Sequence, residues 1–315
     1  MANTPFILVV GAGAIGSYYG AILHRAGCQV GLVAGEDHDA VMANGLCITS
    51  PCGDLSFRPV EVLRAFERPS RSPDYVLLCS KDLQHERPIS HLKPWVATKS
   101  QLVLLHSGQS HQQANERLLA TAFPENTLIS ALPHVALRRL GPHSITHQGQ
   151  GRIVLGCYPE GVDDRCRLLA GYLRAGGVEV EIAEWILTAR WRHDAWNASM
   201  APLAALASGS SNDPANTRNC EQLLRQLAAE TLAVAAAAGH TTQARSIDAH
   251  IAAMRSTAPY LTHVAEGQTA ERPEDIAAIL DQVANKAQRC GVAVPHLQTL
   301  RARLRLRASH AISHT

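Results

Sequence analysis

A glycine motif near the N-terminus is the first feature whose residue types and spacing could do chemistry. Residues 11–16 match the pattern Gly-x-Gly-x-x-Gly. In this pattern Gly11 permits a tight turn, Gly13 lets the backbone approach a pyrophosphate, and Gly16 lets a helix pack closely on a strand. The N–H groups that open the helix then face the anion. We predict that a dinucleotide binds here, and the alternative is a glycine turn kept for packing; the predicted contacts are Gly11, Ala12, Gly13, Ala14, Ile15 and Gly16.

The residues about 20 positions after the motif bear on which dinucleotide binds. An acidic side chain there accepts from the ribose of NAD, whereas an arginine accommodates the 2′-phosphate of NADP. This sequence has Gly35, Glu36 and Asp37, and we expect no arginine close to them. Carboxylates that point toward a 2′-phosphate would repel it. The sequence therefore leans weakly toward NADH over NADPH, and a solvated acidic turn is the alternative.

Short apolar segments that alternate with helical ones must position this motif. Strands are predicted over residues 6–10, 30–34, 75–80, 102–106 and 128–132, with a helix over 17–25. This alternation predicts a Rossmann-type α/β domain whose parallel sheet is covered on both faces. Shorter strands are expected over 144–147, 152–155 and 178–182, with a helix over 162–175.

The pattern of strands ends after residue 182. Long helices are predicted over residues 185–207, 220–238 and 273–289, and the basic tail after Leu300 is expected to be a solvated end. We therefore predict two domains. Residues 1–182 form the dinucleotide-binding domain, and residues 183–315 form an all-α domain.

Composition excludes several classes of protein. The 315 residues are 46% hydrophobic and 18% charged, which excludes a mostly disordered chain. The net charge is +2 without an internal basic run, so neither nucleic acid nor a membrane surface is expected as a partner. We find no signal peptide or membrane span, and the eight cysteines form no Cys-x-x-Cys pair. A cytoplasmic protein with reduced thiols and no metal site is expected.

Lysine is scarce in this chain. The 29 basic residues include only four lysines, Lys81, Lys93, Lys99 and Lys286. No lysine between residues 100 and 285 is available to act as a cation or a proton donor. A bias in codon usage is the simplest interpretation of this deficit, but the deficit still limits the chemistry.

Several segments, taken in order, resemble the ketopantoate reductase (2-dehydropantoate 2-reductase) family. They are residues 11–16, 77–84, 104–108, 146–156, 191–203, 267–271 and 291–295. The resemblance implies a Rossmann domain followed by a helical domain like the C-terminal domain of 6-phosphogluconate dehydrogenase. It also implies that NADPH and a 2-oxo acid meet in the cleft between the domains, and it makes a homodimer possible.

The resemblance implies cofactor-binding roles for three residues beyond the glycine motif. Lys81 matches a lysine that lies near the cofactor and the substrate in the family. Ser107 and Gly108 match a turn that follows the next strand, where the family usually has asparagine and glycine. The arginine that typically ends the family's second strand is Gly35 here.

The catalytic motif of the family is only partly present. Asn197 matches its first asparagine and Glu271 its late glutamate, but His193 stands in place of the lysine. The second asparagine is replaced by Ala201, and the substrate-binding serine falls near residues 258–259, which are alanine and proline. The resemblance therefore implies a divergent member that acts on a substrate other than ketopantoate.

His193 could take over the chemistry of the missing lysine. A cationic donor beside a carbonyl oxygen stabilises the charge that hydride transfer creates and delivers a proton. His193 and Asn197 are four residues apart, so they share one face of a helix. A histidine ordinarily has a pKa of about 6.5, against about 10.4 for lysine, so a carboxylate is needed to keep it protonated. We predict His193 as the acid, Asn197 as a ligand of the substrate and Glu271 as the carboxylate.

Three functions remain open at this point. The first is an NAD(P)H-dependent reductase that acts on a C=O or C=N bond of a small, anionic molecule. The second is a non-redox enzyme on the same scaffold, in which His193 and Glu271 act as acid and base in an isomerisation, cyclisation or elimination. The third is a cofactor-binding homologue without turnover.

Overall fold

The computed structural model describes residues 4–79, 89–105, 112–207, 218–241, 248 and 273–312. It divides into two compact units, of which the first ends at Ile186 and the second begins at Leu187. None of the helices in these described ranges is long and apolar enough to cross a membrane.

The first unit is built on one sheet, which has ten strands in its described part. The strands are β1 (Phe6–Val10), β2 (Gln29–Val33), β3 (Leu46–Thr49), β4 (Leu55–Phe57), β5 (Val62–Leu63), β6 (Tyr75–Leu78), β7 (Gln101–Leu105), β8 (Leu128–Arg139), β9 (Ser144–Cys157) and β10 (Val180–Ile182). Their order is β4-β3-β9-β8-β7-β6-β1-β2-β5, and β10 pairs with β9. The six strands from β8 to β5 are parallel, which confirms the Rossmann-type fold.

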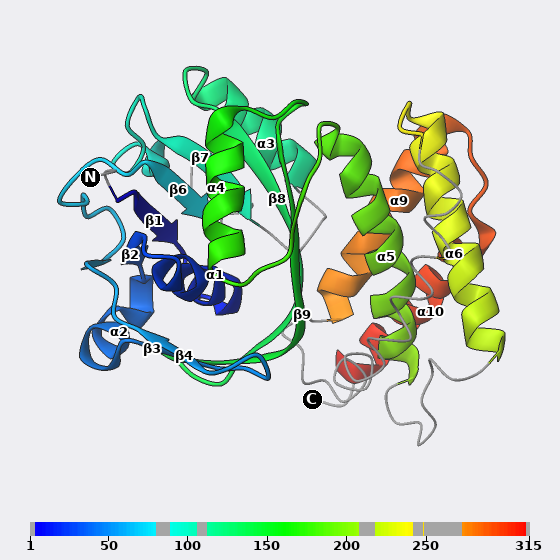
Figure 1. Cartoon of the computed structure of the whole chain (residues 1–315). Helices are drawn as coiled ribbons and strands as arrows, with labels where there is room; N and C mark the ends of the chain where they lie inside the picture. Colours follow the sequence, from blue (N-terminus) through cyan, green and yellow to red (C-terminus); the bar gives the residue numbers. More distant parts are fainter. Residues whose placement is uncertain are drawn as a thin grey trace. The chain divides into compact units, whose positions relative to one another are not determined.

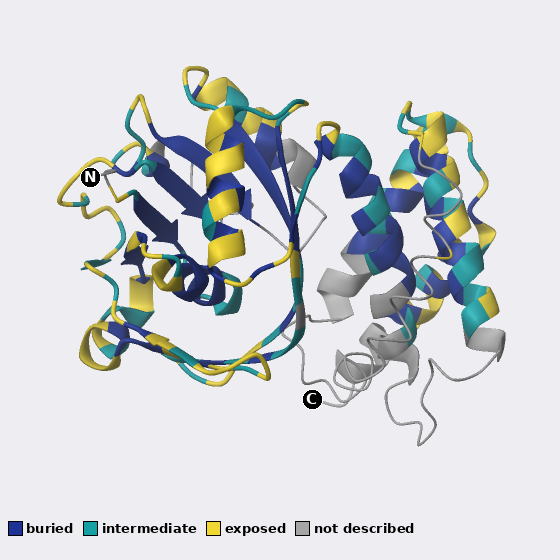
Figure 2. Cartoon of the chain, viewed as in Figure 1, coloured by how far each residue is buried: buried dark blue, intermediate teal, exposed yellow. Residues whose placement is uncertain are grey.

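Helices cover both faces of this sheet (Figure 1). The helices of the unit are α1 (Ala14–Arg25), α2 (His38–Asn44), α3 (Gln112–Ala122) and α4 (Asp164–Ala175). Ile7 and Val9 of β1 pack with side chains of α1 and α4, whereas Phe6, Leu8 and Val10 pack with side chains that include Leu119 of α3. Because both faces are covered, all five residues of β1 are buried (Figure 2).

The sheet is mixed rather than wholly parallel, which corrects the sequence prediction. The strands predicted at 128–132, 144–147 and 152–155 belong to β8 and β9, two long strands that pair antiparallel. Gly149 and Gly151, which look like turn residues in the sequence, lie within β9 with φ of +148° and +133°. The register of the pairing between β8 and β9 shifts twice, so these glycines lie at irregularities of the hydrogen-bonded ladder and do not end the strand.

The second unit is helical in its described residues, as predicted. It contains most of α5 (Ile186–Ala207), together with α6 (Arg218–Ala237), α9 (Pro273–Cys290) and α10 (Pro295–Ile312). Trp191 of α5, Leu227 of α6, Leu280 of α9 and Leu297 of α10 belong to one buried cluster. The expectation of a solvated tail after Leu300 is wrong, because α10 continues to Ile312 and buries Leu304 in this cluster.

Candidate functional site

The glycine motif forms the turn between β1 and α1. Gly11 has φ of +111°, which favours glycine, and its N–H donates to the carbonyl of Val33 at 3.1 Å. A Cβ on Gly16 would lie 2.1 Å from the carbonyl oxygen of Gly11 and 3.2 Å from Cβ of Cys79. Gly11 therefore shapes the turn, and Gly16 allows α1 to pack against β1 and the end of β6.

Gly13 differs from these two glycines because none of the described residues crowds the position of its missing Cβ. Its backbone is extended, with φ of −68° and ψ of 177°, and a Cβ there would meet no atom of the described residues within 4 Å. It is the N-cap of α1, where no side chain caps the helix and no acidic residue lies in the first turn. The first N–H groups of a helix have no partner within the helix. This cradle, open and without negative charge of its own, fits the pyrophosphate of a dinucleotide.

The acidic turn follows β2 as a short 3-10 helix, Gly35–Asp37. The expectation that no arginine lies near it is wrong. Arg139, the last residue of β8, pairs its Nη2 with Oδ2 of Asp37 at 2.5 Å. Arg64, which directly follows β5, pairs with Asp39 at 2.6 Å. These arginines are distant in the sequence, and strand pairing brings them here.

His193 and Asn197 lie on α5, in the second unit. His193 is buried, with 3% of its surface exposed, and Asn197 is half-buried one turn later. Trp191 lies two residues before His193, on another face of the helix, and packs into the helical core. Pro202 lies within the same helix and has no N–H to donate to the carbonyl of Ala198.

Sequence reasoning missed two basic residues near this segment, Arg190 and His240. Arg190 of α5 is only 2% exposed, although a fully buried arginine is rare. His240 follows α6, with its ring 6.4 Å from the ring of Trp191 and its Nδ1 3.4 Å from Oγ1 of Thr188. Burial lowers the pKa of His240, and the positive charges of Lys286 and Arg190 lower it further. No local motif marks either residue, because their environment comes from the packing of three helices.

The remaining predicted site residues lie outside the described residues. These are Lys81, Ser107, Gly108 and Glu271, together with residues 258–259. The described glycine contacts share one turn in the first unit, and His193 shares a helix face with Asn197 in the second.

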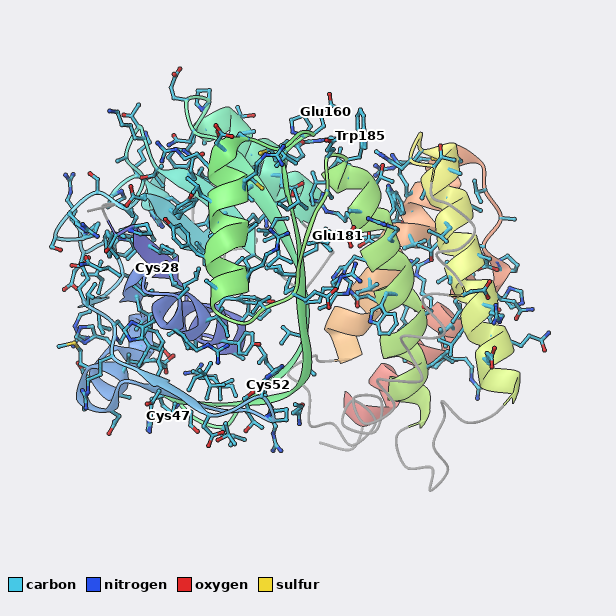
Figure 3. The ribbon with its side chains drawn as sticks, viewed as in Figure 1. Cys28, Cys47, Cys52, Glu160, Glu181 and Trp185 are labelled. Carbon is cyan, nitrogen blue, oxygen red and sulfur yellow. The ribbon has the colours of Figure 1, made fainter. Side chains whose placement is uncertain are left out.

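The seven cysteines whose side chains the structure describes are free thiols. Cys47 and Cys52 are exposed on the segment of β3 and β4, and Cys28 is buried at the start of β2 (Figure 3). Burial raises the pKa of the Cys28 thiol to about 11. No group of three or more metal-binding side chains occurs within the described ranges.

Comparison with known proteins identifies the family of this chain. Residues 7–160 match the family described as Ketopantoate reductase PanE/ApbA, and residues 185–308 match its C-terminal domain. A 2-dehydropantoate 2-reductase from Nostoc is 26% identical over 299 residues, which cover 93% of this chain and 92% of the relative.

Solved structures agree with this match. The 2-dehydropantoate 2-reductase of Methylococcus capsulatus is 34% identical, with a TM-score of 0.81 and 97% of each chain covered. A D-mandelate dehydrogenase solved with NADH and anilino(oxo)acetate shares the fold at 19% identity, with a TM-score of 0.80 over 97% of this chain and 98% of that one. The chain therefore belongs to the ketopantoate reductase family of NAD(P)-dependent oxidoreductases.

Proposed function

We propose that this protein is an NAD(P)H-dependent reductase that reduces a C=O or C=N bond of a small anionic substrate other than ketopantoate. The observation that carries the proposal is the open, uncharged cradle at Gly13, combined with a buried histidine at position 193. The cradle supports binding of the pyrophosphate, and a bound nicotinamide would supply the hydride.

His193 is proposed to provide the proton, and Asn197 to hold the substrate. Reduction of a carbonyl places negative charge on its oxygen, which a cationic donor stabilises and protonates. His193 is buried, and electrostatic interactions are stronger away from water. Glu271, which resembles the family's late glutamate, would keep the imidazole of His193 protonated. The absence of the family's lysine, second asparagine and serine supports a substrate other than ketopantoate.

The first test is binding of the cofactor. NADH and NADPH are titrated separately against the pure protein, and nicotinamide fluorescence is followed. Binding of at least one nucleotide is expected, with a modest preference for NADH because of the acidic turn. Failure of both to bind would reject the reductase.

The second test assigns the proton donor. Small 2-oxo acids and imines are screened for oxidation of the bound cofactor, and His193→Ala is expected to lower kcat at least about 100-fold, in line with loss of a general acid. His193→Lys should recover part of the activity and extend it to higher pH, because lysine stays protonated there. His24→Ala, which removes an exposed histidine on α1, is the control. Full activity in His193→Ala would reject the assigned acid, and binding without any turnover would favour the non-redox alternative.

A further inference from the structure

The ion pairs around the acidic turn bear on a question that the fold leaves open, which is the choice between NADH and NADPH. In dinucleotide-binding sheets the residues that follow the second strand contact the adenosine ribose. Here that position holds the 3-10 turn Gly35–Asp37, which directly follows β2. The backbone of the turn is fixed, because the N–H of Asp37 donates to the carbonyl of Ala34 at 3.0 Å.

Arg139 reaches this turn because the sheet curves. Beyond its parallel part, β8 continues to Arg139 and β9 pairs with β3, which follows α2 in the chain. Figure 1 shows the far ends of β8 and β9 running below α1 toward β3 and α2. The guanidinium of Arg139 therefore lies at the end of β2, about a hundred residues from Asp37 in the sequence.

The pair of Arg139 with Asp37 remains open to solvent. The two side chains are 36% and 21% exposed, so the pair contributes about 0–1 kcal/mol to stability. The Nε of Arg139 also donates to the backbone carbonyl of Gly141 at 3.0 Å. The Nη atoms, which Asp37 holds weakly, are the part of the guanidinium that can turn to a stronger anion. A phosphate offers more negative charge than a carboxylate and takes two parallel hydrogen bonds from arginine.

A second ion pair lies at this end of the sheet. Because β5 pairs with β2, Arg64 lies beside the end of β2 and pairs with Asp39. His38 and Arg64 hold the pKa of Asp39 below its usual range. Asp39 thus has a cationic partner of its own in Arg64, whereas Asp37 is the carboxylate that pairs with Arg139.

We infer that Arg139 is the residue through which this enzyme would accept a 2′-phosphate, and that Asp37 restrains it. With Asp37 in place, the carboxylate occupies Arg139 and the site discriminates little between the two cofactors or favours NADH. Without the carboxylate, Arg139 is available to the phosphate and the site favours NADPH. The inference rests on the proposed function, since it needs a dinucleotide at the glycine motif.

Nucleotide fragments isolate this end of the site from catalysis. Adenosine 2′,5′-bisphosphate and 5′-AMP differ only in the 2′-phosphate, so the ratio of their Kd values reports on the phosphate alone. We expect Asp37→Asn to shift the Kd ratio at least tenfold toward the bisphosphate. Arg139→Gln should shift the ratio at least tenfold against it. Calorimetry measures both fragments, and fluorescence titration of NADH and NADPH should give the same order.

Matched controls separate this effect from a general change of charge. Arg152→Gln and Glu181→Gln each break the ion pair that joins Arg152 of β9 to Glu181 of β10. Glu181 is labelled in Figure 3. These variants should leave the Kd ratio of the two fragments within twofold of the wild type.

The inference is overturned, and the proposed function stands, if the Kd ratio is unchanged in both Asp37→Asn and Arg139→Gln. This outcome requires that both variants bind dinucleotide and keep the unfolding midpoint of the wild type. A wild-type protein that binds neither dinucleotide overturns the proposed function as well.

Discussion

Gly13 and Gly16 belong to the same motif, but a methyl group added to each should have different effects. At Gly13 it should weaken dinucleotide binding, and at Gly16 it should destabilise the fold. Gly13 has an L-compatible backbone and open space at its Cβ, so Gly13→Ala should change the free energy of unfolding by less than about 0.5 kcal/mol. If the pyrophosphate binds here as proposed, the added methyl group would stand in its path, and we expect dinucleotide affinity to fall at least about tenfold, or 1.4 kcal/mol. Thermal unfolding and fluorescence titration measure the two effects.

Gly16→Ala should show the opposite pattern. Its Cβ would lie 2.1 Å from a backbone carbonyl oxygen that cannot move without opening the turn. A loss of stability of about 1–3 kcal/mol is expected, as for other overpacked sites. Gly171→Ala on the exposed side of α4 is the matched control, because its Cβ meets nothing and alanine favours the helix. Equal stability of the Gly13 and Gly16 variants would contradict the roles assigned to these residues.

His240 should make stability depend on pH. Its pKa is lowered in the folded protein by burial and by Lys286 and Arg190, so the unfolded chain binds its proton first as pH falls. Stability is therefore highest above a pH of about 6.5 and decreases as pH drops below that value toward the lowered pKa. Urea unfolding of His240→Gln should show a weaker loss of stability than the wild type as the pH falls below about 6.5. Parallel curves for the two proteins would show that His240 does not contribute.

At the residue scale, the features that could be predicted from the sequence are those that depend only on nearby residues. The turn at Gly11 and the close approach at Gly16 follow from spacing alone, since both depend on neighbours within one βα unit. The neighbours of Asp37 could not be predicted in this way. Arg139 reaches it only because β8 is much longer than its apolar stretch, and strand length and curvature are not local properties.

Among the elements, α10 depends on a single side chain from another helix. Glu230 of α6 accepts hydrogen bonds from the backbone N–H groups of His296 and Leu297, each at 2.9 Å, and its Oε1 lies 2.6 Å from Nδ1 of His296. These N–H groups belong to the first turn of α10, so Glu230 caps that helix from outside the local sequence.

Removal of this cap should destabilise the helical unit. Glu230→Ala is expected to cost about 1–2 kcal/mol, because two partly buried N–H groups lose their acceptor. Glu221→Ala on the same helix is the control, since it alters a partly exposed i,i+4 pair with Arg225 and should cost about 0.5 kcal/mol or less. Denaturant unfolding measures both variants, and a similar small effect in both would argue against the cap.

Long strands and helix ends were the elements that sequence patterns predicted least well. The glycines of β9 are typical of turns, yet strand pairing carries the ladder through them. The arginines after Leu300 suggested a solvated end, but Arg301 and Arg305 bind Asp281 of α9 while Leu304 is buried. In both segments tertiary contacts overrule local composition.

For the whole molecule, the predicted fold class and the family are confirmed, and the predicted site residues stay predictions. The alternation of strands and helices predicts the layered α/β unit that the structure shows. No strand follows β10 in the described residues, where the later elements are all helices. The boundary between residues 182 and 183 likewise stays a prediction. The composition could not predict the identity of the substrate, because the shortage of lysine shows only which cationic side chain is absent.

Binding of the cofactor should stabilise the molecule in a way that locates the site. At a free concentration 100 times its Kd, a ligand that binds only the folded state adds about 2.7 kcal/mol, which raises the unfolding midpoint of a unit of this size by about 5–10 °C. Gly13→Ala, which should fold normally, is expected to lose most of this shift. Hydrogen exchange should slow at the amides of residues 11–17 and 35–37, because those groups would contact the pyrophosphate and the ribose. Protection confined to α6, α9 and α10 would place the nucleotide elsewhere and remove the physical basis of the reductase assignment.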